Sequence, residues 1–182
     1  MARQYEFPAP MVVSFLLALV FGRSLALGEV VSSNESGFQI QIQQTIHADV
    51  HDCFRQALRI QQWWSSDHTY SGDQKNLYLE PKPGGWFGEK LPEGGFVKHL
   101  ELIHLAPNKL IRLTGGLGPL QEMGVNGALT LKFEPMELDT MVTLTYHVSG
   151  FAPSGLDKIA PAVNHVLSEQ IDNLKEAVEK DK

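Results

Sequence analysis

One long amphipathic segment near the carboxyl end of the chain limits the folds that this sequence can adopt. Between Leu156 and Val178, apolar residues recur three or four positions apart, with charged residues between them. This spacing places the apolar side chains on one side of an α-helix. Pro161 lies about one turn inside the segment, so the helix either begins near Ala160 or kinks at the proline. A helix with a single apolar stripe has to pack against another layer of structure.

Short strands are predicted for most of the chain before this helix. The first runs from Gly37 to Ile46, where apolar residues alternate with glutamines, as in a strand with one solvated face. Helical spacing then follows Asp49, a suitable N-cap, over Val50–Trp64, as one helix or two short ones. Six more strands are predicted over Asn76–Glu80, Trp86–Lys90, Phe96–Leu105, Lys109–Thr114, Gly127–Phe133 and Thr140–Val148. Strands followed by one long helix indicate an α+β fold with an antiparallel sheet of about seven strands.

Composition excludes several classes of protein. The 182 residues are 43% hydrophobic and 20% charged, and they contain no internal repeat or linker, which favours one globular domain. Fifteen Lys and Arg against 21 Asp and Glu give a net charge of −6, and no basic run is present. Nucleic acid is therefore not an expected partner. The single cysteine, Cys53, excludes an intrachain disulfide framework and a Cys-rich zinc site.

Residues 1–28 have the pattern of a secretory leader. Met11–Gly22 is an uncharged apolar run of 12 residues, shorter than the roughly 20 that a membrane span needs. Small residues then permit cleavage after Ala26 or after Gly28, although an uncleaved anchor or a buried helix is the alternative. We expect a leader over 1–28, a mature domain over 29–182 and no stable membrane span after cleavage. The protein would be exported, to the periplasm if its source is a Gram-negative bacterium.

Three further segments carry a family resemblance. These are Trp63–Tyr70 (WWSSDHTY), Gly84–Phe87 (GGWF) and Leu113–Leu120 (LTGGLGPL). Together with the order of the predicted elements, they resemble the SRPBCC (START-like, helix-grip) superfamily over roughly residues 37–178. The most similar branch is that of bacterial SRPBCC-domain proteins related to the activator of the heat-shock-protein-90 ATPase.

The resemblance implies more about the fold than about the activity. It implies a curved antiparallel sheet wrapped around the long C-terminal helix, with short helices after the first strand. A hydrophobic cavity would lie between the sheet and that helix. The superfamily includes lipid carriers, hormone binders, polyketide cyclases and cochaperone domains, so the fold does not define the function.

Aromatic and polar side chains near the expected cavity are the candidate ligand contacts. Tryptophan buries a large surface and keeps one donor, which suits a cavity wall, although it could equally pack the short helices on the sheet. His99 and Glu101 share one face of a predicted strand, either the cavity face or the outer face, and Tyr146 is expected to face inward. The glycine-rich loop over Gly115–Asn126 is interpreted as a mobile lid. The candidate ligand-binding residues are Trp63, Trp64, Tyr70, Trp86, His99, Glu101, Leu120, Tyr146, Val163 and Leu167.

Other chemistries lack their sequence patterns. The seven histidines include no HExxH and no third ligand at a defined spacing, so no metal is expected. No G-x-S-x-G elbow is present, and no catalytic residue is assigned. The glycine-rich loop lacks the Lys-Ser/Thr of a phosphate loop, and no cofactor is expected.

Two functions from different classes remain, with a third implied by the family name. The leading hypothesis is an exported protein that binds a small hydrophobic or amphipathic molecule, such as a lipid, with His99, Glu101 and Tyr146 orienting the polar end. The alternative is a polyketide-cyclase-like or hydrolase-like enzyme with His99 and Glu101 as an acid–base pair. A chaperone partner is the third, but bacterial heat-shock protein 90 is cytosolic, so the leader argues against it. The sequence does not indicate the oligomeric state.

Overall fold

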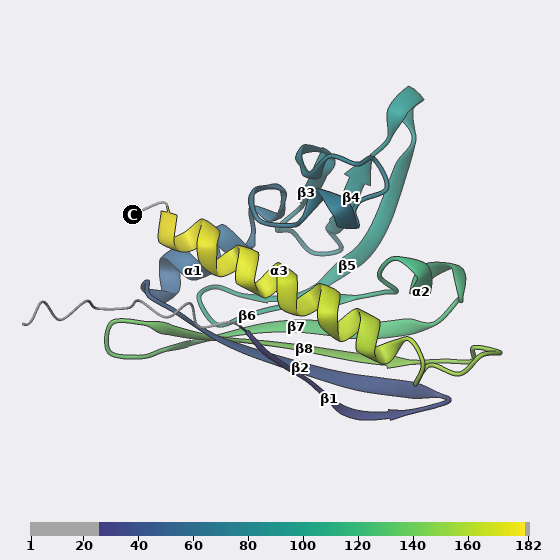
Figure 1. Ribbon diagram of the computed structural model, residues 1–182. Coiled ribbons are helices and arrows are strands. Elements are labelled where there is room, and N and C mark those ends of the chain that lie inside the picture. The colour runs from purple at the N-terminus through teal and green to yellow at the C-terminus, as the bar shows by residue number, and fades with distance from the viewer. Residues whose placement is uncertain (1–25, 181–182) are drawn as a thin grey trace, which may run out of the picture.

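One open antiparallel sheet forms the body of the molecule, and a long helix crosses one of its faces (Figure 1). The computed structural model describes residues 26–180. The sheet has eight strands in the order β1-β2-β8-β7-β6-β5-β4-β3, and every neighbouring pair is antiparallel. The strands are β1 (Leu27–Asn34), β2 (Gly37–Ile46), β3 (Leu77–Leu79), β4 (Trp86–Lys90), β5 (Phe96–Ala106), β6 (Leu110–Thr114), β7 (Asn126–Pro135) and β8 (Thr140–Ser149).

Helical segments are concentrated between β2 and β3 and at the carboxyl end. The α-helices are α1 (Val50–Ala57), α2 (Pro119–Glu122) and α3 (Ala160–Lys180). Four 3-10 turns are η1 (Ile60–Gln62), η2 (Ser66–His68), η3 (Gln74–Asn76) and η4 (Pro92–Gly94). The helix-grip α+β fold is thereby confirmed, with α1 and three short turns placed after the second strand of the chain.

The seven predicted strands are all present, and the eighth is β1. Its residues Leu27 and Gly28 belong to the segment that the sequence assigns to the leader, while residues 1–25 lie outside the described part of the chain. β1 runs along α3 so closely that a Cβ on Gly28 would lie 2.1 Å from Ser168 Oγ. The register between β1 and β2 shifts between Val30 and Ser32, which marks a β-bulge in this edge strand.

The core lies between the sheet and α3. In β2 the alternation of apolar residues and glutamines buries Phe38, Ile40 and Ile42 on the inner face, as the sequence predicts. α3 begins at Ala160, so Pro161 occupies the first turn, where its missing N–H costs nothing. The buried stripe of α3 consists of Leu167, Gln170, Ile171, Leu174 and Val178.

α3 covers only part of the inner face. It packs on β1, β2 and α1, while β5, β4 and β3 turn up from the sheet on the same side (Figure 1). The space between α3 and this upturned part of the sheet is occupied by η1, η2 and the loop that carries α2. The site described below lies in that space.

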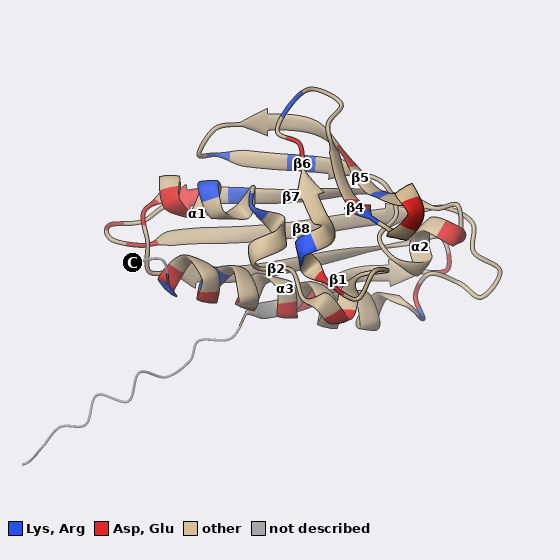
Figure 2. Cartoon of the chain, turned by 90° about the horizontal axis from the view of Figure 1, so that it is seen from above, with Lys and Arg blue, Asp and Glu red and all other residues tan. Residues whose placement is uncertain are grey.

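Charges are mixed on the face seen from above. Figure 2 shows Lys and Arg as single residues among Asp and Glu rather than gathered into one basic surface. Within residues 26–180, no helix is both long enough and apolar enough to cross a membrane.

Candidate functional site

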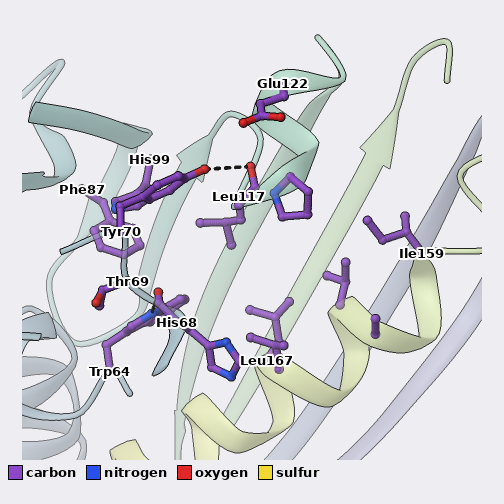
Figure 3. A pocket seen from close by; sticks show the side chains of 15 residues that line it. Trp64, His68, Thr69, Tyr70, Phe87, His99, Leu117, Glu122, Ile159 and Leu167 are labelled. Atoms are coloured by element: carbon purple, nitrogen blue, oxygen red, sulfur yellow. Dashed lines mark hydrogen bonds between the residues drawn. The ribbon is translucent and has the colours of Figure 1, made fainter. Parts of the chain in front are cut away.

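A cavity of about 460 Å³ opens between the amino-terminal half of α3 and the upturned edge of the sheet. Figure 3 shows Tyr70, His99 and Phe87 on one side, Leu117 and Glu122 on a second, and Ile159 and Leu167 on the helix side. Its walls are mainly apolar, and its size lies in the usual range for small-molecule sites. The lining residues are Trp64, His68, Thr69, Tyr70, Phe87, His99, Leu117, Gly118, Pro119, Glu122, Ile159, Ala162, Val163, Val166 and Leu167.

One wall is a cluster of aromatic rings. Trp64 meets Phe87 edge-to-face with ring centroids 5.2 Å apart, and Phe87 lies 4.8 Å from the His99 ring. The Tyr70 ring covers His99 at 5.9 Å and remains half exposed. Contacts of this kind stabilise neighbouring aromatic rings. The cavity therefore has an aromatic side and a helical side.

A β-bulge in β5 aims His99 into this wall. In the pairing of β4 with β5, Phe87 faces Leu100 and Gly88 faces Lys98, so His99 is the extra residue. A bulge interrupts the alternation of faces, which lets both His99 and Leu100 be buried although they are neighbours in sequence. The same interruption separates His99 from Glu101, which is partly exposed and pairs with Lys98.

The carboxylate partner of His99 is Glu89 of β4. His99 Nε2 lies 3.0 Å from Glu89 Oε2, and the two side chains are 6% and 0% exposed. Glu89 Oε2 also accepts from the backbone N–H of Tyr70 at 3.1 Å, and Oε1 accepts from the N–H of Ser71. Each oxygen of this buried carboxylate therefore accepts a hydrogen bond from the backbone of Tyr70 or Ser71, and these bonds hold the loop that carries Tyr70 against the sheet.

The surroundings of this pair define its charge. Burial acts to raise the pKa of the Glu89 carboxyl, but the hydrogen bonds from Ser71, Tyr70 and His99 outweigh burial and lower it. Burial lowers the pKa of His99, and the neighbouring Glu89 only partly opposes this. Near neutral pH, the pair is therefore an ionised carboxylate beside a neutral imidazole. Nε2 carries the proton given to Glu89, and Nδ1 is a hydrogen-bond acceptor.

The second wall is the loop between β6 and β7, which Tyr146 supports from inside the core. Tyr146 is fully buried, and its hydroxyl donates to Gly115 O at 2.8 Å and accepts from Leu117 N at 3.2 Å. A Cβ on Gly127 would lie 2.6 Å from the Tyr146 ring, so glycine makes room for the side chain. From outside, the Tyr70 hydroxyl reaches Gly118 O at 3.4 Å (Figure 3).

The helix wall is joined to the aromatic wall by Gln170. This side chain is fully buried in α3, and its Oε1 accepts from the backbone N–H of Ser65 at 2.7 Å. Trp64, next to Ser65, donates from Nε1 to the carbonyl of His68 at 3.1 Å, and His68 Nε2 lies 3.2 Å from Glu169 Oε2 on α3. These contacts fix the segment that carries Trp64 against the helix.

The structure brings five of the ten residues predicted from sequence to the cavity. These are Trp64, Tyr70, His99, Val163 and Leu167. Leu120 and Tyr146 are fully buried behind the loop wall.

The remaining three lie away from this cavity. Trp63 is buried beside Trp64, at a ring distance of 5.7 Å, and packs towards the sheet core. Trp86 stacks on Phe96 at 5.7 Å, with Lys98 Nζ above its ring. Glu101 is engaged with Lys98.

Sequence reasoning missed Glu89, which accepts three hydrogen bonds behind the aromatic wall. A signal was available, because Phe87 and Glu89 are two apart in the short strand β4 and so share its inner face. A carboxylate on an apolar face needs partners. Within residues 26–180, no group of three or more His, Cys, Asp or Glu side chains is placed to hold a metal ion.

The curved sheet, the C-terminal helix across it and the apolar cavity between them define a helix-grip domain. A family model described as "Activator of Hsp90 ATPase homolog 1-like protein" matches residues 45–179, and the chain belongs to this family. No curated protein matches the sequence.

Solved structures share the fold at low sequence identity. A protein from Mesorhizobium loti is 15% identical with a TM-score of 0.58, and the alignment covers 79% of this chain and 98% of that one. An uncharacterised protein from Rhizobium leguminosarum is 19% identical with a TM-score of 0.57, covering 86% and 99% of the two chains. A protein from Arthrobacter aurescens is 18% identical with a TM-score of 0.56, covering 84% and 93%.

Proposed function

We propose that this protein binds a small hydrophobic or amphipathic molecule, such as a lipid, in the cavity between α3 and the sheet. The observation that carries the proposal is the cavity itself, about 460 Å³ with mainly apolar walls and one buried polar pair, Glu89 and His99. Burial of apolar ligand surface contributes roughly 2.5 kcal/mol per 100 Å² before the costs of association. A ligand of modest size can therefore bind here without an ion pair.

A neutral fluorescent probe tests this proposal. N-phenyl-1-naphthylamine gains fluorescence in apolar sites, and we expect saturable binding to the wild-type protein with one site per chain. Val163→Phe places a larger side chain on the cavity wall and should weaken binding at least tenfold. His165→Phe adds the same ring to an exposed position of α3 that does not line the cavity, so it should leave the affinity unchanged. Linear, non-saturating fluorescence, or equal effects of the two variants, would count against the proposal.

We propose further that the protein is exported and that its leader is removed after Ala26. Cleavage there leaves β1 complete from Leu27, whereas cleavage after Gly28 removes two of its residues. Amino-terminal sequencing of the protein from the envelope fraction of its own host should begin at Leu27. Ala26→Tyr disrupts the small-residue pattern of both sites and should leave the longer precursor. Recovery of the uncleaved wild-type chain from the cytosol would refute export.

One observation favours a second candidate, an enzyme of the polyketide-cyclase or hydrolase type. His99 is a neutral imidazole oriented by a buried carboxylate, which is the arrangement of a general base. An enzyme would turn over a substrate with a rate that rises as pH passes the lowered pKa of His99, and His99→Ala would abolish that rise. Binding without turnover across a panel of polyketide-like and ester substrates would contradict the enzyme candidate and would leave binding as the one proposed function.

A further inference from the structure

The charges around the cavity point to the kind of ligand that it accepts. Of the described residues that line it, none is Lys or Arg, and the only carboxylate is that of Glu122. Two more carboxylates lie directly behind the lining, those of Glu89 against His99 and Glu169 against His68. A carboxylate or phosphate on a ligand would enter a region of negative potential with no opposite charge in the wall.

Among the polar side chains of the lining, His99 offers an acceptor. Because Glu89 is ionised and faces Nε2 of His99, that nitrogen carries the ring proton, and Nδ1 keeps a lone pair. His99 lies in the lining with Tyr70 across it (Figure 3). An acceptor of this kind is satisfied by a hydroxyl that donates, whereas a carboxylate offers only acceptors.

Both oxygens of Glu89 are already hydrogen-bonded within the protein. Oε2 accepts from Tyr70 N and His99 Nε2, and Oε1 accepts from Ser71 N. These oxygens therefore do not depend on a cationic group of a ligand for their hydrogen bonds. Bringing an ammonium group into this apolar space would cost its hydration, and the one carboxylate of the lining, Glu122, is exposed to solvent, where an ion pair contributes little.

We propose that the cavity selects an uncharged amphiphile whose hydroxyl donates to His99, and that it discriminates against carboxylates of the same shape. This inference rests on the proposed binding function, since it names the class of ligand for that same cavity. The aromatic wall of Trp64, Tyr70 and Phe87 suits a flat ring as the apolar part. Free fatty acids and anionic lipids are then poor ligands, although they are amphiphilic.

Four ligands with the same ring test the inference by titration calorimetry at pH 7.5. They are 2-naphthalenemethanol, 2-naphthoate, 2-naphthylmethylammonium and 2-ethylnaphthalene. The alcohol should bind at least tenfold more tightly than the carboxylate. It should bind about threefold to tenfold more tightly than the hydrocarbon, the usual effect of one neutral hydrogen bond. The ammonium compound should bind no more tightly than the alcohol.

Matched variants separate the effect of the His99 acceptor on binding from the effect of the Glu122 charge. His99→Phe should abolish the preference for the alcohol over the hydrocarbon, whereas Val163→Ala should weaken all four ligands alike. Glu122→Gln, at an exposed position, should strengthen 2-naphthoate about twofold to fivefold, the usual range for an exposed charge. Glu134→Gln makes the same change at an exposed position outside the cavity and should have no effect. Glu122→Gln keeps the test valid even if His99→Phe fails to fold.

The outcomes distinguish the inference from the function on which it rests. If none of the four ligands saturates the protein, the binding function fails and the inference fails with it. If the ligands saturate but 2-naphthoate binds as tightly as the alcohol, the inference is overturned and the binding function stands. Tenfold tighter binding of the ammonium compound than of the alcohol would overturn it as well.

Discussion

Removal of the Tyr146 hydroxyl tests how the cavity's loop wall is held in place. Tyr146→Phe deletes one oxygen and keeps the buried ring, which packs edge-to-face on Phe38 with centroids 6.4 Å apart. The carbonyl of Gly115 then loses its donor at 2.8 Å and the N–H of Leu117 loses its acceptor at 3.2 Å. Leu117 lines the cavity, so the change acts on the wall without touching a ligand.

The size of the effect follows from the two backbone groups that lose their partner. Each buried group left unsatisfied costs about 1–3 kcal/mol, reduced here where the loop can move and admit water. We expect Tyr146→Phe to lower the free energy of unfolding by about 2 kcal/mol, which corresponds to a fall in Tm of roughly 4–8 °C for a domain of this size.

Urea unfolding measures this loss of stability, provided that the m-value is the same in both proteins. Hydrogen exchange shows which part of the chain is destabilised. The amide of Leu117 should exchange faster in the variant than in the wild-type protein. Tyr70→Phe is the control, because Tyr70 is half exposed and its hydroxyl meets Gly118 O only at 3.4 Å, so removal of this hydroxyl should cost less than about 0.5 kcal/mol. A loss below 0.5 kcal/mol in Tyr146→Phe, or unaltered exchange at Leu117, would refute the reasoning.

Alkaline pH gives a second test of the same side chain. Burial raises the pKa of Tyr146 to about 12, because the phenolate is poorly solvated in the core. A pKa raised in the folded state contributes stability that is complete below the unfolded value near 10 and is lost as pH rises towards 12. The loss approaches about 2–3 kcal/mol. Phenylalanine does not titrate, so the stability difference between wild type and Tyr146→Phe should narrow above pH 10, and a constant difference up to pH 11.5 would contradict this.

Three further variants or conditions test the site from other sides. Leu167→Ala should lower the free energy of unfolding in urea by about 2–3 kcal/mol. This is the lower end of the range for a buried leucine, because one side of Leu167 already borders the cavity. A loss above about 4 kcal/mol would argue against an open cavity. Gln170→Leu should cost about 1–3 kcal/mol and speed exchange of the Ser65 amide, whose acceptor it removes. The folded pKa values of Glu89 and His99 are both lowered, so both groups contribute their full stabilisation above about pH 6.5. The contribution of His99 is lost as pH falls below 6.5, and that of Glu89 is lost as pH falls below 4.5. Urea midpoints at pH 7, 6, 5 and 4 should decrease in that order, and a flat profile would show that neither group is perturbed.

Hydrophobic periodicity was sufficient to predict most of the fold. Seven strands and the long helix follow from local patterns, because each element has one apolar face and the sheet is antiparallel. Of the two alternatives that Pro161 leaves open, a start near Ala160 or a kink, the structure has the start at Ala160. β1 escaped prediction since its sequence, LGEVVSSN, has no apolar alternation, and its side chains are mostly exposed. It is held by backbone pairing with β2 and by close contact with α3. Neither interaction can be predicted from the sequence of β1 alone.

The candidate site was harder to predict because it depends on an interruption of periodicity. Strict alternation along β5 pairs His99 with Glu101 on one face, whereas the bulge turns His99 inward beside Leu100 and gives it Glu89 from the neighbouring strand. A bulge is a property of two strands in register, so the sequence of one strand does not reveal it. The aromatic segment Trp63–Tyr70 predicts Trp64 and Tyr70 at the cavity, but it predicts Trp63 there equally, and Trp63 packs in the core beside Trp64. Leu167 follows from the apolar stripe of the long helix.

The open sheet also has a consequence for how copies of the chain meet. An open sheet ends in two strands whose outer N–H and C=O groups can pair with another chain and begin aggregation. Here one edge, β3, is only three residues long, and the other, β1, carries the bulge at Val31 that breaks its regular ladder. Both are features that hinder strand addition. The two backbone edges of the sheet that borders the apolar cavity are therefore poor templates for a strand from another copy of the chain.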